Sequence, residues 1–174
     1  MEQNIEALVK AAKKQDAHAF ATLYKMVYRD MYAYAFYLLR KPEDAEDIVS
    51  ETVISAFESI GKLRNPDKFR HWIFAILANK CRKKLGSYST FPAELTEDIP
   101  IPQPETTEED RQDLKRAFAV LNEEEKMIVN SFIFAGYKGN EIAEKMSLNP
   151  STVRSRYRRA LAKMRKYMEG GALT

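Results

Sequence analysis

The sequence predicts an all-α fold of two small helical domains joined by a flexible, acidic, proline-rich linker. Apolar residues recur at three- and four-residue spacing along nearly every segment, as in amphipathic helices, and no run alternates as a strand would. The exception is residues 86–108, which contain four prolines and no periodic apolar face. Residues 86–110 also carry seven acidic side chains and no basic one. We therefore expect domains at residues 1–85 and 109–174, with a linker between them.

Local signals place the helices of the first domain. Asp16 is a suitable N-cap, because its side chain can accept hydrogen bonds from free backbone donors. Pro42 suits the start of a helix, where the carboxylates that follow it complement the positive end of the helix dipole. Glycine and proline interrupt the helical pattern at residues 61–69. The expected helices are residues 4–14, a segment following Asp16, a tyrosine-rich segment ending at Leu39, residues 42–59 and residues 68–85.

The second domain has the layout of a helix-turn-helix. Helices are expected at residues 109–121 and 123–134, followed by two shorter helices with a turn between them. The exposed face of the last helix is rich in arginine, whose guanidinium groups pair with guanine edges and phosphates in the major groove. A solvated basic face on an ordinary C-terminal helix is the alternative interpretation. The residues of this predicted DNA-binding face are Ser151, Thr152, Arg154, Ser155, Arg158 and Arg159.

The net charge of +3 conceals an uneven distribution along the chain. Residues 1–61 carry seven basic and ten acidic side chains, whereas residues 62–85 carry eight basic and one acidic. Residues 150–167 hold seven basic side chains and no acidic one. Two basic blocks separated by an acidic connector indicate two contacts with a polyanion.

The first basic block interleaves its cations with apolar and aromatic side chains, a composition that suits unpaired nucleic-acid bases. Trp72 and Phe74 lie at helical spacing, where a place in the hydrophobic core is the more common role. Asn79 follows three apolar residues, so it is either a satisfied helix contact or the reader of a base edge. The residue types alone leave both roles open for Asn79.

Several motifs resemble those of bacterial RNA polymerase sigma factors. The segments LNEEEKMIVNSF and TVRSRYRRALAKMR resemble the fourth conserved region of that family. The segments DAHAFATLY, DAEDIVSET and FRHWIFAILANKCRKKL resemble, in order, parts of the second conserved region in the extracytoplasmic-function (ECF) group of the sigma-70 family. The sequence departs from the family pattern at Ser50, at Val53 and in GYKGNEIA, positions that affect surfaces and local packing.

The resemblance implies a protein that binds core RNA polymerase and directs promoter-specific initiation. It implies that the last helix reads the upstream promoter element as duplex and that the first domain reads the downstream element as a melted strand. In the family, the loop matching residues 63–69 receives a flipped base, and the position matching Asn79 lines that site. The downstream-element residues implied are Leu63, Arg64, Asn65, Lys68, Phe69, Asn79, Lys80 and Lys83.

The acidic helix at residues 42–59 is assigned by the same resemblance to the clamp helices of the polymerase largest subunit. Phosphates repel carboxylates, so an acidic face is poorly placed on DNA and well placed on a basic protein helix. By residue types alone, simple solvation of these acids would be the favoured interpretation. The resemblance also implies the polymerase flap and an anti-sigma factor as partners, and a linker that follows the RNA-exit path. The implied core-polymerase contacts are Asp44, Asp47, Ile48 and Glu51.

The sequence argues against catalysis, cofactors and bound metal. No nucleophile with a partner base and no phosphate-binding glycine loop is visible. His18 and His71 are too few and too scattered for a zinc site, and Cys81 fits a small packing residue better than a redox sensor. The longest apolar run, residues 31–39, is far below the ~20 residues of a spanning helix, and no secretory signal is visible. We expect a cytoplasmic protein without direct membrane insertion, attached to a membrane only through an anti-sigma factor.

Two other functions compete with this interpretation. A free-standing helix-turn-helix regulator would use its first domain to sense a ligand or to dimerise. Such a domain has no need of the eight cations at residues 62–85, whereas a surface that binds single strands does. An enzyme or interaction protein whose basic helices merely contact RNA is the third candidate, and it lacks a supporting catalytic constellation.

Overall fold

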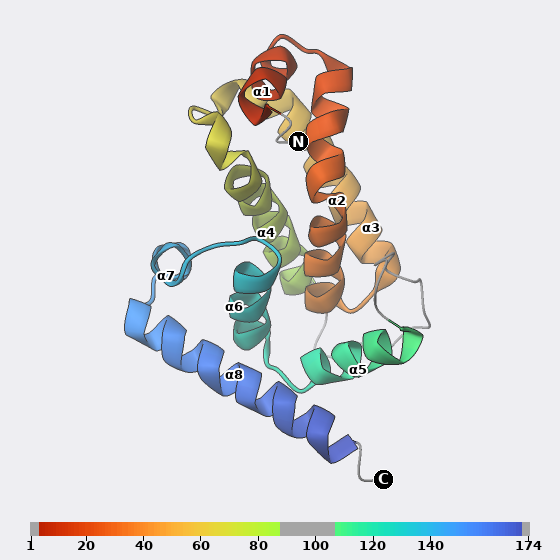
Figure 1. Cartoon of the computed structure of the whole chain (residues 1–174), viewed down its shortest axis with the longest axis vertical. Helices are drawn as coiled ribbons and strands as arrows, with labels where there is room; N and C mark the ends of the chain where they lie inside the picture. The colour runs from red at the N-terminus through yellow and green to blue at the C-terminus, as the bar shows by residue number, and fades with distance from the viewer. Residues whose placement is uncertain (1–3, 88–106, 172–174) are drawn as a thin grey trace. The chain divides into compact units, whose positions relative to one another are not determined.

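The computed structural model describes residues 4–87 and 107–171. Within these ranges the chain forms eight α-helices and two short 3-10 turns, with no strand. The helices form two compact units, Met1–Ile101 and Pro102–Thr174. In Figure 1 the helices of the first unit run from red to yellow-green, and those of the second unit from green to blue. The predicted all-α class with two helical domains is confirmed.

The first unit begins with α1 (Ile5–Lys13) and α2 (Ala17–Leu39). Asp16 is the N-cap of α2, as predicted, and its Oδ1 accepts hydrogen bonds from the backbone N–H groups of His18 and Ala19 at 2.9 and 3.1 Å. The sequence predicted two successive helices here, but α2 is one continuous helix of 23 residues. No glycine or proline interrupts it, so nothing in the backbone breaks the helix where the composition changes.

The second half of α2 is enclosed by its neighbours. All nine residues from 31 to 39 are buried, including three tyrosines. A helix that is apolar on every face must be covered on every face, and α3 (Pro42–Ser59) and α4 (Phe69–Ser87) both pack against it. The change from a half-exposed to an enclosed helix therefore explains the change in composition along α2.

α3 has the bounds that the sequence predicted. Pro42 occupies its first turn, where no intrahelical partner for a backbone N–H is available in any case. The buried stripe of α3 includes Val49 and the polar Thr52. Thr52 is tolerated there because its Oγ1 donates a hydrogen bond to the backbone carbonyl of Ile48 at 2.7 Å.

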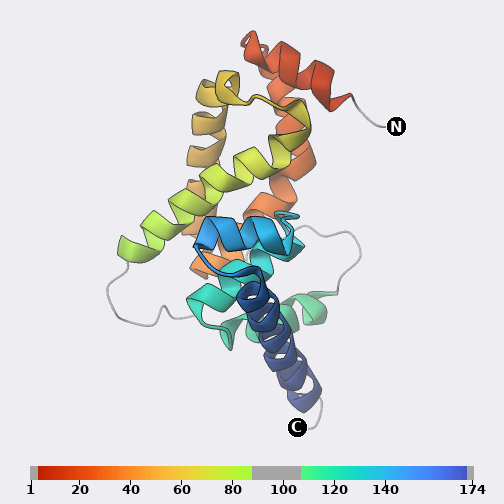
Figure 2. The ribbon, with the colours of Figure 1, turned by 90° about the vertical axis from the view of Figure 1, so that its left-hand side faces the viewer.

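Two 3-10 turns, Ile60–Lys62 and Pro66–Lys68, connect α3 to α4. α1 packs against both turns, at one end of the bundle formed by α2, α3 and α4 (Figure 2). Asp30 on α2 and Arg70 on α4 form an ion pair, Oδ2 to Nη2, at 2.5 Å, and the guanidinium lies 5.2 Å from the ring centre of Phe74. These contacts fix the start of α4, and the turn before it, against α2.

The helices beside the predicted linker extend into it at both ends. α4 continues to Ser87, and α5 (Glu108–Ala119) begins after the N-cap Thr107. The predicted linker residues Gly86, Ser87 and Glu108 are therefore helical, and the linker residues between them lie almost entirely outside the described ranges.

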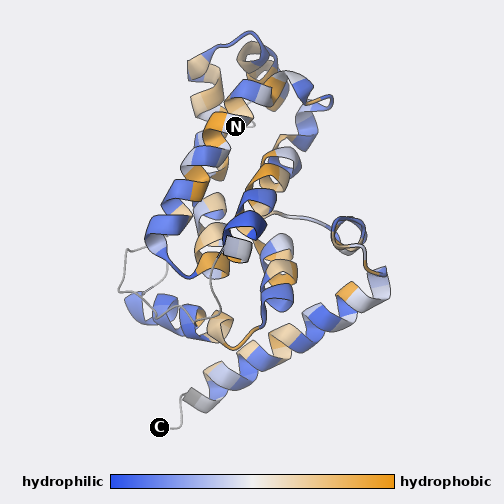
Figure 3. Ribbon diagram, turned by 180° about the vertical axis from the view of Figure 1, so that it is seen from behind, coloured by the Kyte–Doolittle hydropathy of each residue, from blue (hydrophilic) through white to orange (hydrophobic). Residues whose placement is uncertain are grey.

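The second unit also contains α6 (Glu123–Ile133), α7 (Gly139–Met146) and α8 (Pro150–Gly171). α8 packs against each of the other three helices. Its 22 residues make it about 33 Å long, much longer than the short helix that the sequence predicted. The first glycine after its start is Gly170, so the helix continues well past the helix-turn-helix segment. Hydrophilic residues dominate α8 in Figure 3 and are interrupted by the apolar residues of its buried side.

Candidate nucleic-acid interface

The predicted duplex-reading face occupies the first turns of α8. Ser147, with a φ of 55°, forms the left-handed turn after α7, and Val153, which has no exposed surface, anchors α8 to the unit. The spacing of three and four residues places the predicted side chains on one side of the helix. Thr152 is half-buried, and the other predicted residues are exposed: Ser151, Arg154, Ser155, Arg158 and Arg159.

Two ion pairs hold α8 against the start of α6. Lys163 Nζ lies 2.6 Å from Oε1 of Glu125, and Arg156 pairs with Glu124. Because Arg156 is engaged with α6, it is not part of the duplex-reading face, and the sequence analysis had not placed it there. Both acids come from the first turn of α6, so the start of that helix sets the position of α8.

Glu125 is the most constrained of these acids, with 9% of its surface exposed. It forms a capping box with Asn122: each side chain accepts a hydrogen bond from the other residue's backbone N–H, at 2.8 and 3.0 Å. Burial alone would raise the pKa of Glu125, but the hydrogen bonds from Lys163 and Asn122 and the charges of Lys163 and Arg159 lower it below the usual 4.5. Glu125 is therefore ionised at neutral pH. The sequence analysis missed this role, although an asparagine followed three residues later by glutamate was its signal.

The predicted strand-binding residues of the loop divide into buried and exposed groups. Leu63 and Phe69 are each 4% exposed, so they support the loop from inside and offer no surface to a base. This corrects the expectation that these two side chains contact the strand. Asn65 Oδ1 accepts a hydrogen bond from the backbone N–H of Asp67 at 3.0 Å, which stabilises the second 3-10 turn. The predicted loop residues that are exposed are Arg64, Asn65 and Lys68.

Asn79 lies on the exposed side of α4. Arg82 Nη1 is 3.5 Å from its Oδ1, which is a long hydrogen bond. Asn79 is therefore not a buried amide satisfied by the helix core, and its polar groups are accessible to a base. Lys83 is exposed beside it, whereas Lys80 is half-buried.

The aromatic residues of α4 serve the core more than the surface. Phe74 has no exposed surface, and its ring centre lies 5.8 Å from that of Tyr34. The expectation that Phe74 is a core residue is confirmed. Trp72 is half-buried, with its ring centre 6.2 Å from that of Phe69, so it closes the core below the loop.

The acidic residues predicted to contact polymerase lie on α3 in different environments. Asp47 and Glu51 are exposed, with 60% of the Glu51 side chain accessible. The side chain of Asp44 is only 17% exposed. Ile48 is only 6% exposed and belongs to the core, which corrects its assignment as a contact residue. Ile54 is 60% exposed and was not predicted, although its spacing of seven from Asp47 and three from Glu51 places it on their face.

Two ion pairs link this acidic face of α3 to α4. Lys84 Nζ lies 3.2 Å from Oδ1 of Asp44, and Lys80 Nζ lies 3.9 Å from Oε2 of Glu51. Both lysine side chains are about one-third exposed or less. Their ammonium groups therefore lie along the line where α3 and α4 meet.

Three further findings concern the thiol, groups of metal-ligating side chains and apolar helices. Cys81 has no exposed surface, and burial raises the pKa of its thiol to about 12, so the thiol is protonated and inaccessible at neutral pH. Among the described residues, no three histidine, cysteine, aspartate or glutamate side chains are placed to hold a metal ion. None of the described helices is long and apolar enough to cross a membrane.

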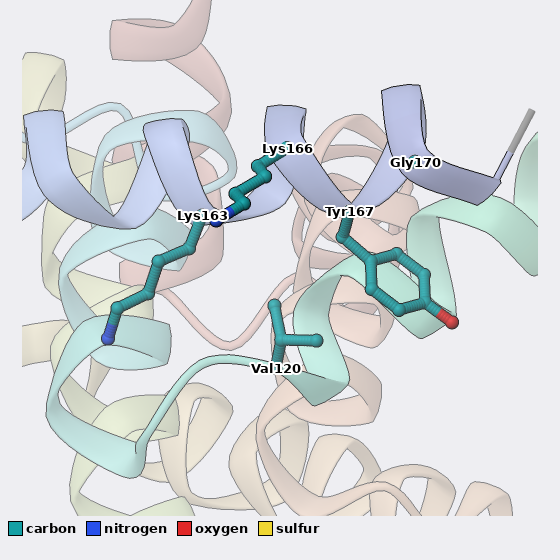
Figure 4. A pocket seen from close by; sticks show the side chains of 5 residues that line it. All are labelled: Val120, Lys163, Lys166, Tyr167 and Gly170. Carbon is teal, nitrogen blue, oxygen red and sulfur yellow. The ribbon is translucent and has the colours of Figure 1, made fainter. Parts of the chain in front are cut away.

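A hollow of about 510 Å³ lies beside the second half of α8, away from the duplex-reading face (Figure 4). Val120 and Tyr167 expose 40% and 42% of their surfaces there. The hollow is open and largely apolar, with ammonium groups beside it, as a docking surface for another protein would be. Its lining residues are Val120, Lys163, Lys166, Tyr167 and Gly170.

The helix-turn-helix unit and the basic surfaces of both units are typical of the class of all-helical proteins that bind nucleic acid. Comparison with known families is more specific. The family model "Sigma-70 region 2" matches residues 23–89, and the model "Sigma-70, region 4" matches residues 111–164. The two matched segments lie in the first and second units respectively.

Individual relatives extend this match to nearly the whole chain. The chain is 32% identical over 175 residues to RNA polymerase sigma factor NccH of Alcaligenes xylosoxydans xylosoxydans, covering 91% of each protein. It is 26% identical over 168 residues to the ECF RNA polymerase sigma factor SigM of Mycobacterium tuberculosis, covering 96% of this chain and 86% of SigM. The chain therefore belongs to the sigma-70 family of RNA polymerase sigma factors, in the ECF group.

Solved structures share the fold. Sigma factor RpoE, in complex with the anti-sigma factor NepR from Bartonella quintana, matches with a TM-score of 0.71 at 21% identity, covering 86% of this chain and 96% of RpoE. CnrH, in complex with the cytosolic domain of CnrY, matches with a TM-score of 0.64 at 22% identity, covering 94% of this chain and 96% of CnrH. At these identities the likeness supports the fold alone.

Proposed function

We propose that this sigma factor binds core RNA polymerase through α3 and recognises promoters through two basic surfaces, one on each unit. The observation that carries the proposal is the exposed arginine face of α8, held in place by the acids of α6. Nucleotide addition is left to core polymerase in this proposal. The relatives that match the chain are named as RNA polymerase sigma factors, and the proposal gives this chain a role in initiation.

The upstream promoter element is assigned to α8, which would read it as duplex. A helix of ~10–12 Å diameter fits the major groove, which is about 12 Å wide. Arg154 and Arg158 are one turn apart on the exposed side, so their guanidinium groups can reach neighbouring base pairs. Ser151 and Ser155 lie on the same side and are suited to phosphate or base contacts.

The downstream element is assigned to the loop before α4 and to α4 itself, which would read it as a melted strand. Arg64, Lys68 and Lys83 are exposed cations suited to phosphates. The accessible amide of Asn79 can donate and accept hydrogen bonds at a base edge, which supplies sequence preference. Leu63 and Phe69 would support this surface from below by holding the loop in shape.

Core polymerase is assigned to the acidic face of α3. Ile54 lies next to Asp47 and Glu51 on this face, and its exposed apolar side chain can enter an interface that the carboxylates border. Carboxylates of this kind complement a basic helix, such as the clamp helices expected from the family. Simple solvation would explain the acids but gives Ile54 no role.

Two further partners are proposed for this chain. The apolar hollow in Figure 4 offers a surface on the second unit for the polymerase flap, with Lys163 and Lys166 at its rim. An anti-sigma factor is proposed because RpoE and CnrH were each solved with a partner, named for RpoE as an anti-sigma factor. Such a partner would also be the route by which this chain is held at a membrane.

The deciding experiment is transcription by purified core polymerase on a library of promoters, with and without this chain. We expect the chain to select a subset of promoters that share an upstream and a downstream element. A chain that binds duplex tightly and specifically without core polymerase, and adds nothing to initiation, would instead be an autonomous helix-turn-helix regulator. The acidic face of α3 would then lack a purpose.

A further inference from the structure

Gly139, the first residue of α7, is a glycine that the backbone does not require. Gly136 has a φ of 72°, a left-handed conformation that favours glycine, whereas Gly139 begins a helix and has no positive φ. Glycine is also a poor helix former compared with alanine. Gly139 lies in GYKGNEIA, where the sequence departs from the family pattern. The reason for this glycine therefore lies in the side chains around it.

Two side chains of the second unit lie where a side chain of residue 139 would point. A β-carbon at Gly139 would lie 3.6 Å from Cζ of Phe132 and 3.9 Å from Cγ of Arg154, which are ordinary contact distances. By contrast, a β-carbon at Gly61 or Gly86 would meet no atom within 4 Å. α7 packs against α8 beside the first turns of that helix (Figure 1). The stem of Arg154, on the proposed duplex-reading face, therefore lies against the bare backbone at the start of α7.

Hydrogen bonds hold the start of α7 in place. The backbone N–H of Tyr137 donates to the backbone carbonyl of Ser131, next to the end of α6, at 3.0 Å. The backbone N–H of Lys138 donates to Oε2 of Glu141 at 2.8 Å, which fixes the first turn of α7. The backbone at Gly139 therefore cannot move away from α8 without breaking these contacts.

The two neighbours of Gly139 differ in how freely they can move. Phe132 is half-buried, and its ring centre lies 4.2 Å from that of Tyr157 on α8, so its position is set by ring packing. Arg154 is exposed, and its long stem rotates about several bonds. A side chain at residue 139 that extends beyond a methyl group would therefore displace the stem of Arg154 and leave the ring of Phe132 in place.

We infer that Gly139 is a positioning residue for Arg154: the absence of a side chain lets the arginine stem lie against α7, and this sets where the guanidinium meets the upstream element. The inference rests on the proposed function, in which α8 reads that element, and adds a residue of α7 that acts through Arg154. A guanidinium that pairs with a guanine edge forms two hydrogen bonds of fixed direction. A displaced stem therefore weakens discrimination at one base pair and leaves the other positions unchanged.

The test measures binding of the holoenzyme to duplexes in which each base pair of the upstream element is substituted in turn. Gly139→Leu should reduce the preference at one base pair about fivefold, at the lower end of what a paired arginine contributes. Gly139→Ala should keep the wild-type preference, because a methyl group fits at contact distance. Asn140→Leu adds the same side chain at the next, exposed position, and this control should also keep the preference.

Arg154→Ala shows whether residue 139 acts through the arginine. This variant should lose the preference at the same base pair, and Gly139→Leu should then change the preference at no position. A shift caused by Gly139→Leu that persists beside Arg154→Ala would overturn the inference. An unchanged preference in Gly139→Leu, while Arg154→Ala is still effective, would overturn it as well.

A second variant covers the case in which leucine at residue 139 impairs folding, which thermal unfolding would detect. Gly139→Met has an unbranched, flexible side chain that needs less room beside Phe132, and it should shift the preference at the same base pair. An unchanged preference in a folded Gly139→Met would contradict the inference. Failure of the proposed function gives a different result, because Arg154→Ala and Arg158→Ala would then both leave every base preference unchanged.

Discussion

The basic surfaces on α8 and α4 differ in how their cations are held. On α8, Arg154 and Arg158 are exposed and form no ion pair among the described residues, because the nearby acids of α6 engage Arg156 and Lys163 instead. On α4, the acids of α3 pair directly with Lys80 and Lys84. Acidic residues therefore position the helix in one unit and restrain the cations themselves in the other.

This difference matches the two forms of DNA proposed for the two surfaces. A duplex presents fixed base edges, and the planar guanidinium group of arginine recognises them best when it is already in place. A melted strand is flexible, and its phosphates need mobile point charges such as lysine ammonium groups. The cations proposed to read duplex on α8 are therefore already exposed and unpaired among the described residues, whereas Lys80 and Lys84 on α4 are held by the acids of α3.

The largest effect is expected at the preformed surface. Arg158→Ala should reduce discrimination between upstream elements by roughly 1–3 kcal/mol, because a paired guanidinium contributes about that much at a base edge. Holoenzyme binding to matched and substituted upstream elements would measure it. Arg165→Ala, an exposed arginine further along α8, is the control and should leave discrimination unchanged. Equal losses on every upstream sequence in Arg158→Ala would make that residue a phosphate contact.

A smaller effect is expected at the acidic face of α3, whose carboxylates pair with the lysines of α4. Asp47→Lys should weaken assembly with core polymerase about tenfold, because a close charge pair at the interface becomes repulsive. Glu46→Lys, an exposed acid on another side of α3, is the control. Titration of labelled chain with core polymerase would measure both, and both variants should keep the wild-type unfolding free energy within about 0.5 kcal/mol. Equal affinities for the two variants would remove α3 from the interface.

The base reader on α4 should give an effect smaller still. Asn79→Ala should reduce the base preference of the downstream element about fivefold, and should impair strand opening more than formation of the closed complex. Permanganate footprinting would follow the opening. Arg82→Ala removes the partner of the long hydrogen bond to Asn79 and should lower affinity uniformly, with base preference unchanged. Loss of base preference in Arg82→Ala alone would give the reading role to the arginine.

The sequence predicted the parts of the fold that depend on local chemistry. Asp16 and Pro42 start their helices where capping and fixed φ favour it, and α3 ends where predicted. The continuity of α2 and the length of α8 were missed, because both depend on which surfaces neighbouring helices cover. Along α2 the side chains change from half-exposed to enclosed, but no glycine or proline marks the change, and only the amino-acid composition differs.

The candidate site was predictable to the same extent. Helical spacing placed the side chains of α8 on one face, and the structure exposes most of them. Spacing could not show that Leu63 and Phe69 are turned into the core, because they lie at the ends of an irregular loop. Helical spacing did favour a buried Ile48, and only the family resemblance made that residue a contact. The ion pairs from α3 to α4 join residues far apart in the chain, and they follow from antiparallel packing that no local pattern encodes.

The smallest effect is expected for the acids of α6, which the comparison describes as holding α8 in position. Glu125→Gln should lower the stability of the α6–α8 contact by about 0.5 kcal/mol at neutral pH, because the half-exposed ion pair with Lys163 is lost while the shape of the side chain is kept. Hydrogen exchange of the α6 and α8 backbone amides is the suitable measurement. The fluorescence of the single tryptophan, Trp72, would report on the first unit. Glu123→Gln, an exposed acid in the same helical turn, is the control and should leave exchange nearly unchanged.

The pH dependence of this effect has a definite sign. The pKa of Glu125 is lowered in the folded chain, so its carboxylate contributes stability that is fully present above the usual pKa of 4.5. That contribution is lost as the pH falls through the lower, folded-state pKa, where the folded carboxylate takes up a proton and the attraction of Lys163 and Arg159 disappears. The difference between wild type and Glu125→Gln should therefore be constant at neutral pH and shrink below pH 4.5. Other carboxylates titrate in the same range, but they are common to wild type and Glu125→Gln and cancel in the difference. A difference that stays constant through this range would mean that Glu125 holds α8 by its shape and hydrogen bonds, and that its charge has no part in positioning the duplex reader.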